Sequence, residues 1–120
     1  MAGFRNQTEL PAIYAAADLL VLPSSGEETW GLVVNEAMEC GLPVLCSQRA
    51  GCSEDLLRDG ENGWLFDPAT PAGFRSALEH ALRCERRRAL GESARETASH
   101  FRPERMAEGM RRAIDAALVR

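Results

Sequence analysis

Lysine is absent from the sequence, and all fourteen basic residues are arginines. Chemistry that depends on a lysine amine, such as a Schiff base or a lysine clamp on a phosphate, is therefore excluded for this chain. The basic residues are also outnumbered by 18 acidic ones, which gives a net charge of -4. Nucleic acids and anionic membranes need a basic surface, so we expect neither as the main partner.

Metal-site spacing and long apolar runs are absent as well. The cysteines form no C-x-x-C pair, so no metal site is expected. No apolar run approaches the roughly 18 residues of a membrane-spanning helix, and the N-terminus has no apolar stretch of signal-peptide length. We interpret the thiols as buried and reduced in a cytoplasmic protein. They are Cys40, Cys46, Cys52 and Cys84.

The 120 residues instead alternate between short apolar runs and amphipathic stretches. The runs at 18–24, 43–47 and 63–66 predict strands, the first of them covered on both faces. Connections of this length favour parallel strands, so we predict one α/β domain over residues 1–120. Its sheet has about three to four strands, with flanking helices and a helical C-terminal third. The predicted helices cover 9–17, 32–40, 53–60, 71–83, 86–99 and the residues from 103 onward.

Local signals predict where these helices begin and end and what they bury. Thr8 is expected to cap the first helix with Pro11 in its first turn, and Gly41 to end the second. The buried stripe of the second helix is predicted to be Val33, Ala37 and Cys40. A second stripe follows the last helix at Met106, Met110, Ile114 and Leu118. This stripe predicts a helix that lies on the body of the protein.

Ligands of such folds bind at the carboxyl ends of the parallel strands, here the loops 24–30, 47–53 and 67–70. The first loop leads into a helix whose initial N–H groups suit a phosphate or a sugar oxygen. Carboxylates before and inside that helix can line one cleft and accept hydrogen bonds from neighbouring sugar hydroxyls. The residues concerned are Glu28, Gly31, Leu32, Val33 and Glu36.

This segment resembles the C-terminal part of group 1 glycosyltransferases, which are retaining enzymes of the GT-B type with two Rossmann-like domains. Their hallmark is E-x7-E in the context PS…E…G-L-V…E-A…G-x-P-V. The matching residues are Pro23, Ser24, Glu28, Gly31, Leu32, Val33, Glu36, Ala37, Gly41, Pro43 and Val44. The later segment AGCSEDLLRDGENGWLFDP, with Gly51 and Glu54, is also similar. The match covers nearly the whole chain.

The resemblance implies a donor site for a UDP-, GDP- or ADP-sugar, with no cofactor and no metal. It implies that Glu28 is the catalytic residue beside the donor sugar and that Glu36 binds the ribose hydroxyls. The other substrate-binding residues that it implies are Thr29, Trp30, Gly31, Leu32 and Val33. From the residues themselves we interpret Trp30 and Trp64 as packing residues and Asn35 as a capping or solvent residue.

The resemblance also implies that the chain is a truncated donor-binding domain with a partial Rossmann-like sheet. The acceptor domain, the first strands and the basic residues that neutralise the pyrophosphate have no counterpart here, and Arg49 is not expected to replace them. We therefore expect no sugar transfer from this chain alone. The strand at 18–24 would expose an apolar edge, which predicts a homo-oligomer or a separately encoded complementary half. The alternative is a non-catalytic, self-associating module.

Overall fold

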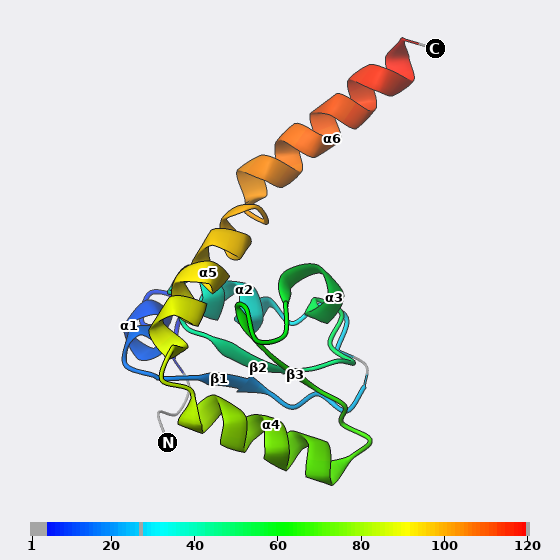
Figure 1. Ribbon diagram of the computed structural model, residues 1–120. Helices are drawn as coiled ribbons and strands as arrows, with labels where there is room; N and C mark the ends of the chain where they lie inside the picture. Colours follow the sequence, from blue (N-terminus) through cyan, green and yellow to red (C-terminus); the bar gives the residue numbers. More distant parts are fainter. Residues whose placement is uncertain (1–4, 27, 120) are drawn as a thin grey trace.

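Three short parallel strands form the centre of the molecule in the computed structural model, which describes residues 5–26 and 28–119 (Figure 1). Within those residues the sheet order is β1-β2-β3, with Leu20 opposite Val44 and Val44 opposite Gly63. The strands are β1 Leu20–Leu22, β2 Val44–Ser47 and β3 Gly63–Phe66. The predicted α/β class and the parallel sheet are confirmed. The last strand begins and ends at the predicted residues.

Helices cover both faces of this sheet (Figure 1). In chain order they are α1 Leu10–Ala15, α2 Leu32–Glu39, α3 Ser53–Leu56, α4 Pro71–Arg83, α5 Arg87–Ser99 and α6 Pro103–Leu118. Val44 and Cys46 of β2 pack with α2, α3 and α5, whereas Leu45 packs on the opposite face with α4. All four residues of β2 are buried, because β2 is the central strand and both of its faces are covered.

The strand β1 is shorter and less covered than the sequence predicted. It spans Leu20–Leu22, and all three residues are only partly buried. Both faces are nevertheless covered in part, because Leu20 and Leu22 pack against the core on the α2 face and Val21 packs against the core on the α4 face. In the described part of the chain β1 lies at the edge of the sheet.

The first helix also differs from its prediction. It begins at Leu10 with no side-chain cap, although Pro11 does lie in its first turn. Thr8 does not cap it, because the Thr8 hydroxyl donates to Asn6 Oδ1 at 2.5 Å instead. A turn over residues 6–9 therefore precedes the helix.

The helix α2 is buried on a different face from the predicted one. Its buried residues are Val34, Ala37 and Met38, while Val33 is 39% exposed. The predicted stripe through Val33 and Cys40 is wrong by about one position, since α5 packs on the side that carries Val34 and Met38. The predicted end of α2 is right: Gly41 follows it with a φ of 74°, a left-handed conformation that glycine adopts without strain.

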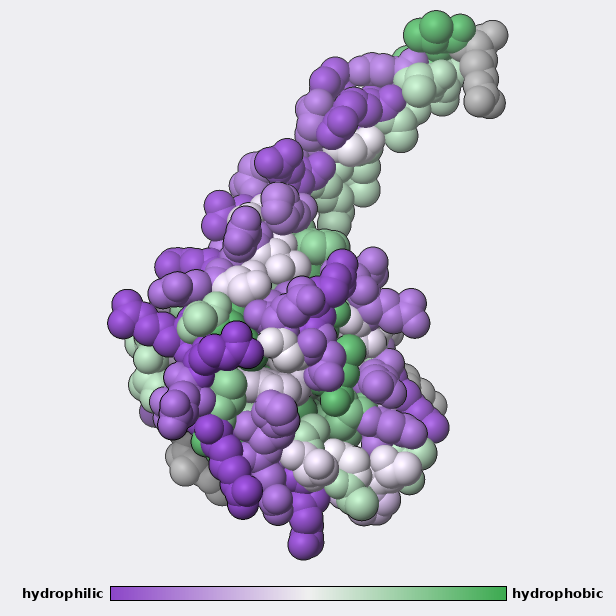
Figure 2. All heavy atoms as spheres, in the orientation of Figure 1, coloured by the Kyte–Doolittle hydropathy of each residue, from purple (hydrophilic) through white to green (hydrophobic). Residues whose placement is uncertain are grey.

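The last helix, α6, extends away from the body and does not lie on it (Figure 1). Its apolar stripe is exposed: Met106 61%, Met110 59%, Ile114 59% and Leu118 79%. Figure 2 shows apolar atoms, in green, along one flank of the projecting helix. The stripe was predicted correctly, but the prediction that it packs on this domain is wrong. None of the helices in the described ranges is both long enough and apolar enough to cross a membrane.

Candidate functional site

The candidate site begins where the loop after β1 enters α2. Gly31 precedes the helix with a φ of 97°, and a Cβ there would lie 3.0 Å from Leu22 and 3.4 Å from Cys52 Sγ. The N–H groups of Leu32 and Val33 make no hydrogen bond within the described part of the chain. Both residues face solvent, so the first turn of α2 has donors available for an external acceptor.

The loop after β2 holds this first loop in place. Gly51 N–H donates to the Glu28 carbonyl at 3.1 Å, and Cys52 N–H donates to the Trp30 carbonyl at 3.0 Å. A Cβ on Gly51 would lie 2.0 Å from the Thr29 carbonyl oxygen, so only glycine permits this contact. These bonds fix the backbone on both sides of Thr29, whose side chain is exposed.

Glu28 and Arg49 lie at this junction of the two loops. Ser24 Oγ donates to Glu28 Oε2 over a long 3.5 Å, and Glu28 is only partly buried. Arg49 Nη1 donates to the Ser25 carbonyl at 3.1 Å. The guanidinium therefore lies against the loop that carries Glu28, a position that its place in the sequence gave no reason to expect.

The Glu36 carboxylate is fixed by a residue that sequence reasoning missed. Tyr14 Oη donates to Glu36 Oε2 at 2.8 Å, from α1 to α2. Burial and the neighbouring Glu36 carboxylate raise the pKa of Tyr14 to about 12, so the hydroxyl is a firm donor at neutral pH. No spacing rule links two residues that are 22 positions apart in sequence.

The loop aromatic, Trp30, is fixed to the same helix. Its indole N–H donates to Asn35 Oδ1 at 2.7 Å, and its ring centroid lies 6.4 Å from that of Phe101. The prediction that Asn35 is a capping or solvent residue is therefore wrong, because its side chain accepts this bond from Trp30. Trp64 is 4% exposed in the core, which confirms its interpretation as a packing residue.

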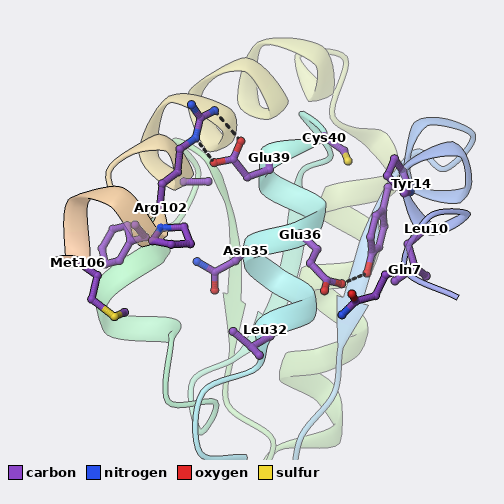
Figure 3. Close-up of a pocket in the computed structure, with 14 residues that line it drawn as sticks. Gln7, Leu10, Tyr14, Leu32, Asn35, Glu36, Glu39, Cys40, Arg102 and Met106 are labelled. Carbon is purple, nitrogen blue, oxygen red and sulfur yellow. Dashed lines mark hydrogen bonds and ion pairs between the residues drawn. The ribbon is translucent and has the colours of Figure 1, made fainter.

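A groove of about 600 Å³ runs over the outer face of α2, between α1 and the junction of α5 with α6 (Figure 3). Its walls are largely apolar, and Leu32 and Glu36 contribute to them from successive turns of α2. Glu28 is not among its lining residues. That Glu28 and Glu36 line one cleft therefore remains a prediction.

An ion pair closes one end of the groove. Arg102 Nε and Nη2 donate to Glu39 Oε1 and Oε2, both at 2.8 Å. The Arg102 guanidinium holds the pKa of the Glu39 carboxyl below its usual range. The two residues are 63 positions apart in sequence, so no local pattern could have revealed the pair.

The four cysteines are free thiols that differ in burial. Cys46 and Cys52 are fully buried, whereas Cys40 and Cys84 are partly exposed, so the expectation of four buried thiols holds for two. The hydrogen bond between Cys46 and Cys52, together with burial, raises the pKa of the Cys46 thiol. No group of three or more metal-ligating side chains occurs among the residues whose positions are described.

The parallel sheet with helices on both faces defines an α/β domain of the class that binds ligands at the carboxyl edge of the sheet, and comparison with known proteins gives its family. The family described as glycosyl transferases group 1 matches residues 1–97, and the chain belongs to this family. A D-inositol 3-phosphate glycosyltransferase of Corynebacterium kroppenstedtii is 39% identical over 98 residues, which are 81% of this chain and 21% of that protein.

Solved structures agree with this assignment. Sucrose-phosphate synthase of Thermosynechococcus elongatus superposes with a TM-score of 0.83 at 30% identity, over 98% of this chain and 30% of that one. Anabaena HepE, in complex with UDP and glucose, gives 0.81 at 26% identity, over 96% of this chain and 31% of that one. The fold is that of GT-B glycosyltransferases, and the chain spans less than a third of the length of these relatives.

Proposed function

We propose that the chain is the nucleotide-sugar donor-binding half of a retaining glycosyltransferase that transfers a hexosyl group to an acceptor. The observation that carries the proposal is the open first turn of α2, with Glu36 one turn further along on the groove wall. The N–H groups of that turn suit the pyrophosphate, and the carboxylate suits the ribose hydroxyls. The HepE relative, whose structure holds UDP and glucose, supports this choice of ligand.

Glu28 is proposed as the catalytic residue beside the donor sugar. Its backbone is fixed by Gly51, while its carboxylate has one long contact with Ser24. Departure of a nucleoside diphosphate needs positively charged groups beside the pyrophosphate, because negative charge develops on it as it leaves. Arg49 brings one guanidinium to this loop. We propose that further cations come from a complementary half, so that the chain alone binds a donor without transferring sugar.

The donor site predicts binding of UDP-, GDP- or ADP-sugars in the millimolar range, followed by amide NMR shifts of the labelled chain. The shifts should cluster at residues 29–36. Glu36→Ala is expected to weaken binding about tenfold, because the ribose loses a charged acceptor. Glu61→Ala removes an exposed carboxylate at the turn before β3 and should leave the affinity unchanged. Equal binding by both variants would remove Glu36 from the site.

A non-catalytic, self-associating module is the second candidate, and the edge of β1 favours it. That strand pairs with β2 on one side, and its residues are only partly covered. We predict that the purified chain sediments as a dimer or larger species at tens of micromolar. Ile114→Glu, which places a charge in the exposed stripe of α6, should not change this if association uses β1. A monomer at all concentrations would contradict the prediction.

A further inference from the structure

We propose that Tyr14 completes a ribose subsite, in which it both positions the Glu36 carboxylate and accepts a hydrogen bond from the ribose. Its hydroxyl holds the Glu36 carboxylate so that the two side chains together recognise the neighbouring hydroxyls of a ribose. The site would thereby select ribonucleotides over 2′-deoxyribonucleotides. This inference rests on the donor site proposed above and names the feature of the donor that the site distinguishes.

The geometry that carries the inference is the hydrogen bond across the groove. Tyr14 Oη and Glu36 Oε2 lie 2.8 Å apart, and both side chains line the groove (Figure 3). Tyr14 is partly buried and packs against the core cluster that includes the buried face of α2, so this packing restricts its ring. Within the described residues Tyr14 is the single hydrogen-bond partner of the Glu36 carboxylate. One carboxylate oxygen is thus held, and the other is available to a ligand.

The chemistry of the pair suits two hydroxyls on adjacent carbons. A tyrosine hydroxyl that donates its proton keeps its oxygen lone pairs as acceptors. Glu36 Oε1 provides a second acceptor beside it. A ribose can donate its 2′- and 3′-hydroxyls to these two atoms, whereas a 2′-deoxyribose leaves one of them unpaired. A site built to bond a hydroxyl rejects the analogue that lacks it far better than an apolar pocket does.

The hydrogen bond also lowers the entropic cost of binding. A glutamate side chain loses rotamer freedom when a ligand fixes it, and that loss weakens binding. Tyr14 restricts Glu36 before the ligand arrives. Glu36 on α2 and Cys40 directly after it are the titratable groups that act on Tyr14, and both favour its protonated form. The donor is therefore intact throughout the physiological pH range.

The inference is tested by NMR titration of the whole chain with UDP and with 2′-deoxy-UDP. We expect the wild type to bind UDP about tenfold more tightly, as for a hydrogen bond to a charged group. Tyr14→Phe removes only the hydroxyl and should reduce this preference to about twofold. Ile13→Val, one residue earlier in α1, is the matched control and should keep the preference. A Tyr14→Phe chain that retains the full preference for ribose overturns the inference and leaves the donor site standing.

Absence of shifts with either nucleotide in the wild type would overturn the donor site itself, and the inference with it. The pairing is also measurable without a ligand, because Tyr14 is the only tyrosine in the sequence. Its ultraviolet absorbance on deprotonation should give a midpoint near pH 12, and Glu36→Gln should lower that midpoint toward the ordinary value of 10.0. Circular dichroism at each pH shows whether the chain is still folded. Identical midpoints in the two folded chains would contradict the hydrogen bond on which the inference rests.

Discussion

Replacing Gly91 with alanine is expected to lower the free energy of unfolding by about 3 kcal/mol, at the upper end of overpacking effects. Gly91 lies in α5, where a Cβ would sit 2.0 Å from the Gly41 carbonyl oxygen and 3.0 Å from its carbonyl carbon. Both are backbone atoms at the end of α2, so no side-chain rotation relieves the overlap. The two helices would have to separate along the contact that joins α2 to α5.

Urea denaturation followed by circular dichroism measures this effect. Gly109→Ala is the matched control, because Gly109 is also in a helix and has no atom within 4 Å of the position of a Cβ. Its replacement should stabilise α6 by up to about 1 kcal/mol, the usual gain for alanine over glycine in a helix. Equal unfolding midpoints for the two variants would show that α2 and α5 are not packed as tightly as described.

Replacing Gly51 with alanine is expected to displace the loop that carries Glu28 while leaving the sheet folded. The new Cβ would lie 2.0 Å from the Thr29 carbonyl oxygen, and Gly51 itself is exposed. The strain is therefore relieved outward, by movement of the loop, and not through the core. The two backbone hydrogen bonds between the loops, from Gly51 N–H to Glu28 and from Cys52 N–H to Trp30, would lengthen. We expect nucleotide-sugar affinity to fall at least about tenfold, since the N–H groups of α2 lose their placement beside the loop.

Amide NMR spectra report the displacement without a ligand. Large shifts should be confined to residues 24–33 and 48–53. Gly26→Ala is the control from the same loop, because nothing lies within 4 Å of a Cβ there. Wild-type shifts at Thr29 and Trp30 in the Gly51→Ala chain would refute the prediction.

The elements that were predicted best are those whose signals are local. Consecutive apolar residues located β2 and β3, and the helix predicted at 71–83 matches α4 at both ends. Pro71 is the first residue of α4, and the Thr70 hydroxyl before it donates to the Asp67 carbonyl. Gly41 likewise predicted the end of α2, and in the structure this glycine has a positive φ.

The phase of α2 could not be predicted, for a physical reason. Leu32, Val33 and Val34 are all apolar, so periodicity alone allows more than one buried face. The contact with α5, whose residues lie about 60 positions later, selects Val34. Local sequence patterns also could not predict the partners of Glu36 and Glu39. Tyr14 and Arg102 are distant from them in sequence and contact them only in the tertiary fold.

Asn62 shows how a sequence pattern can be noticed and its role missed. It belongs to the D-G-x-N-G segment that resembles the family. The side chain is 1% exposed, accepts from Arg58 N–H at 2.8 Å and donates to the Leu56 carbonyl and to Thr97 Oγ1. These hydrogen bonds connect the turn before β3 to α5, so the role of Asn62 is structural. A pattern shared with a family of enzymes does not by itself distinguish a residue that contacts the ligand from a residue that stabilises the fold.

The two tryptophans give the molecule two separate optical reporters. Trp30 is half-buried at the loop, with its indole N–H bonded to Asn35, whereas Trp64 is enclosed in the core on the α4 face of the sheet. Indole emission depends on hydrogen bonding and on solvent access, so the two rings emit from different environments. Trp30 is open to a small collisional quencher and Trp64 is shielded from it. Intrinsic fluorescence can therefore follow the loop and the core of the same unlabelled chain in one cuvette.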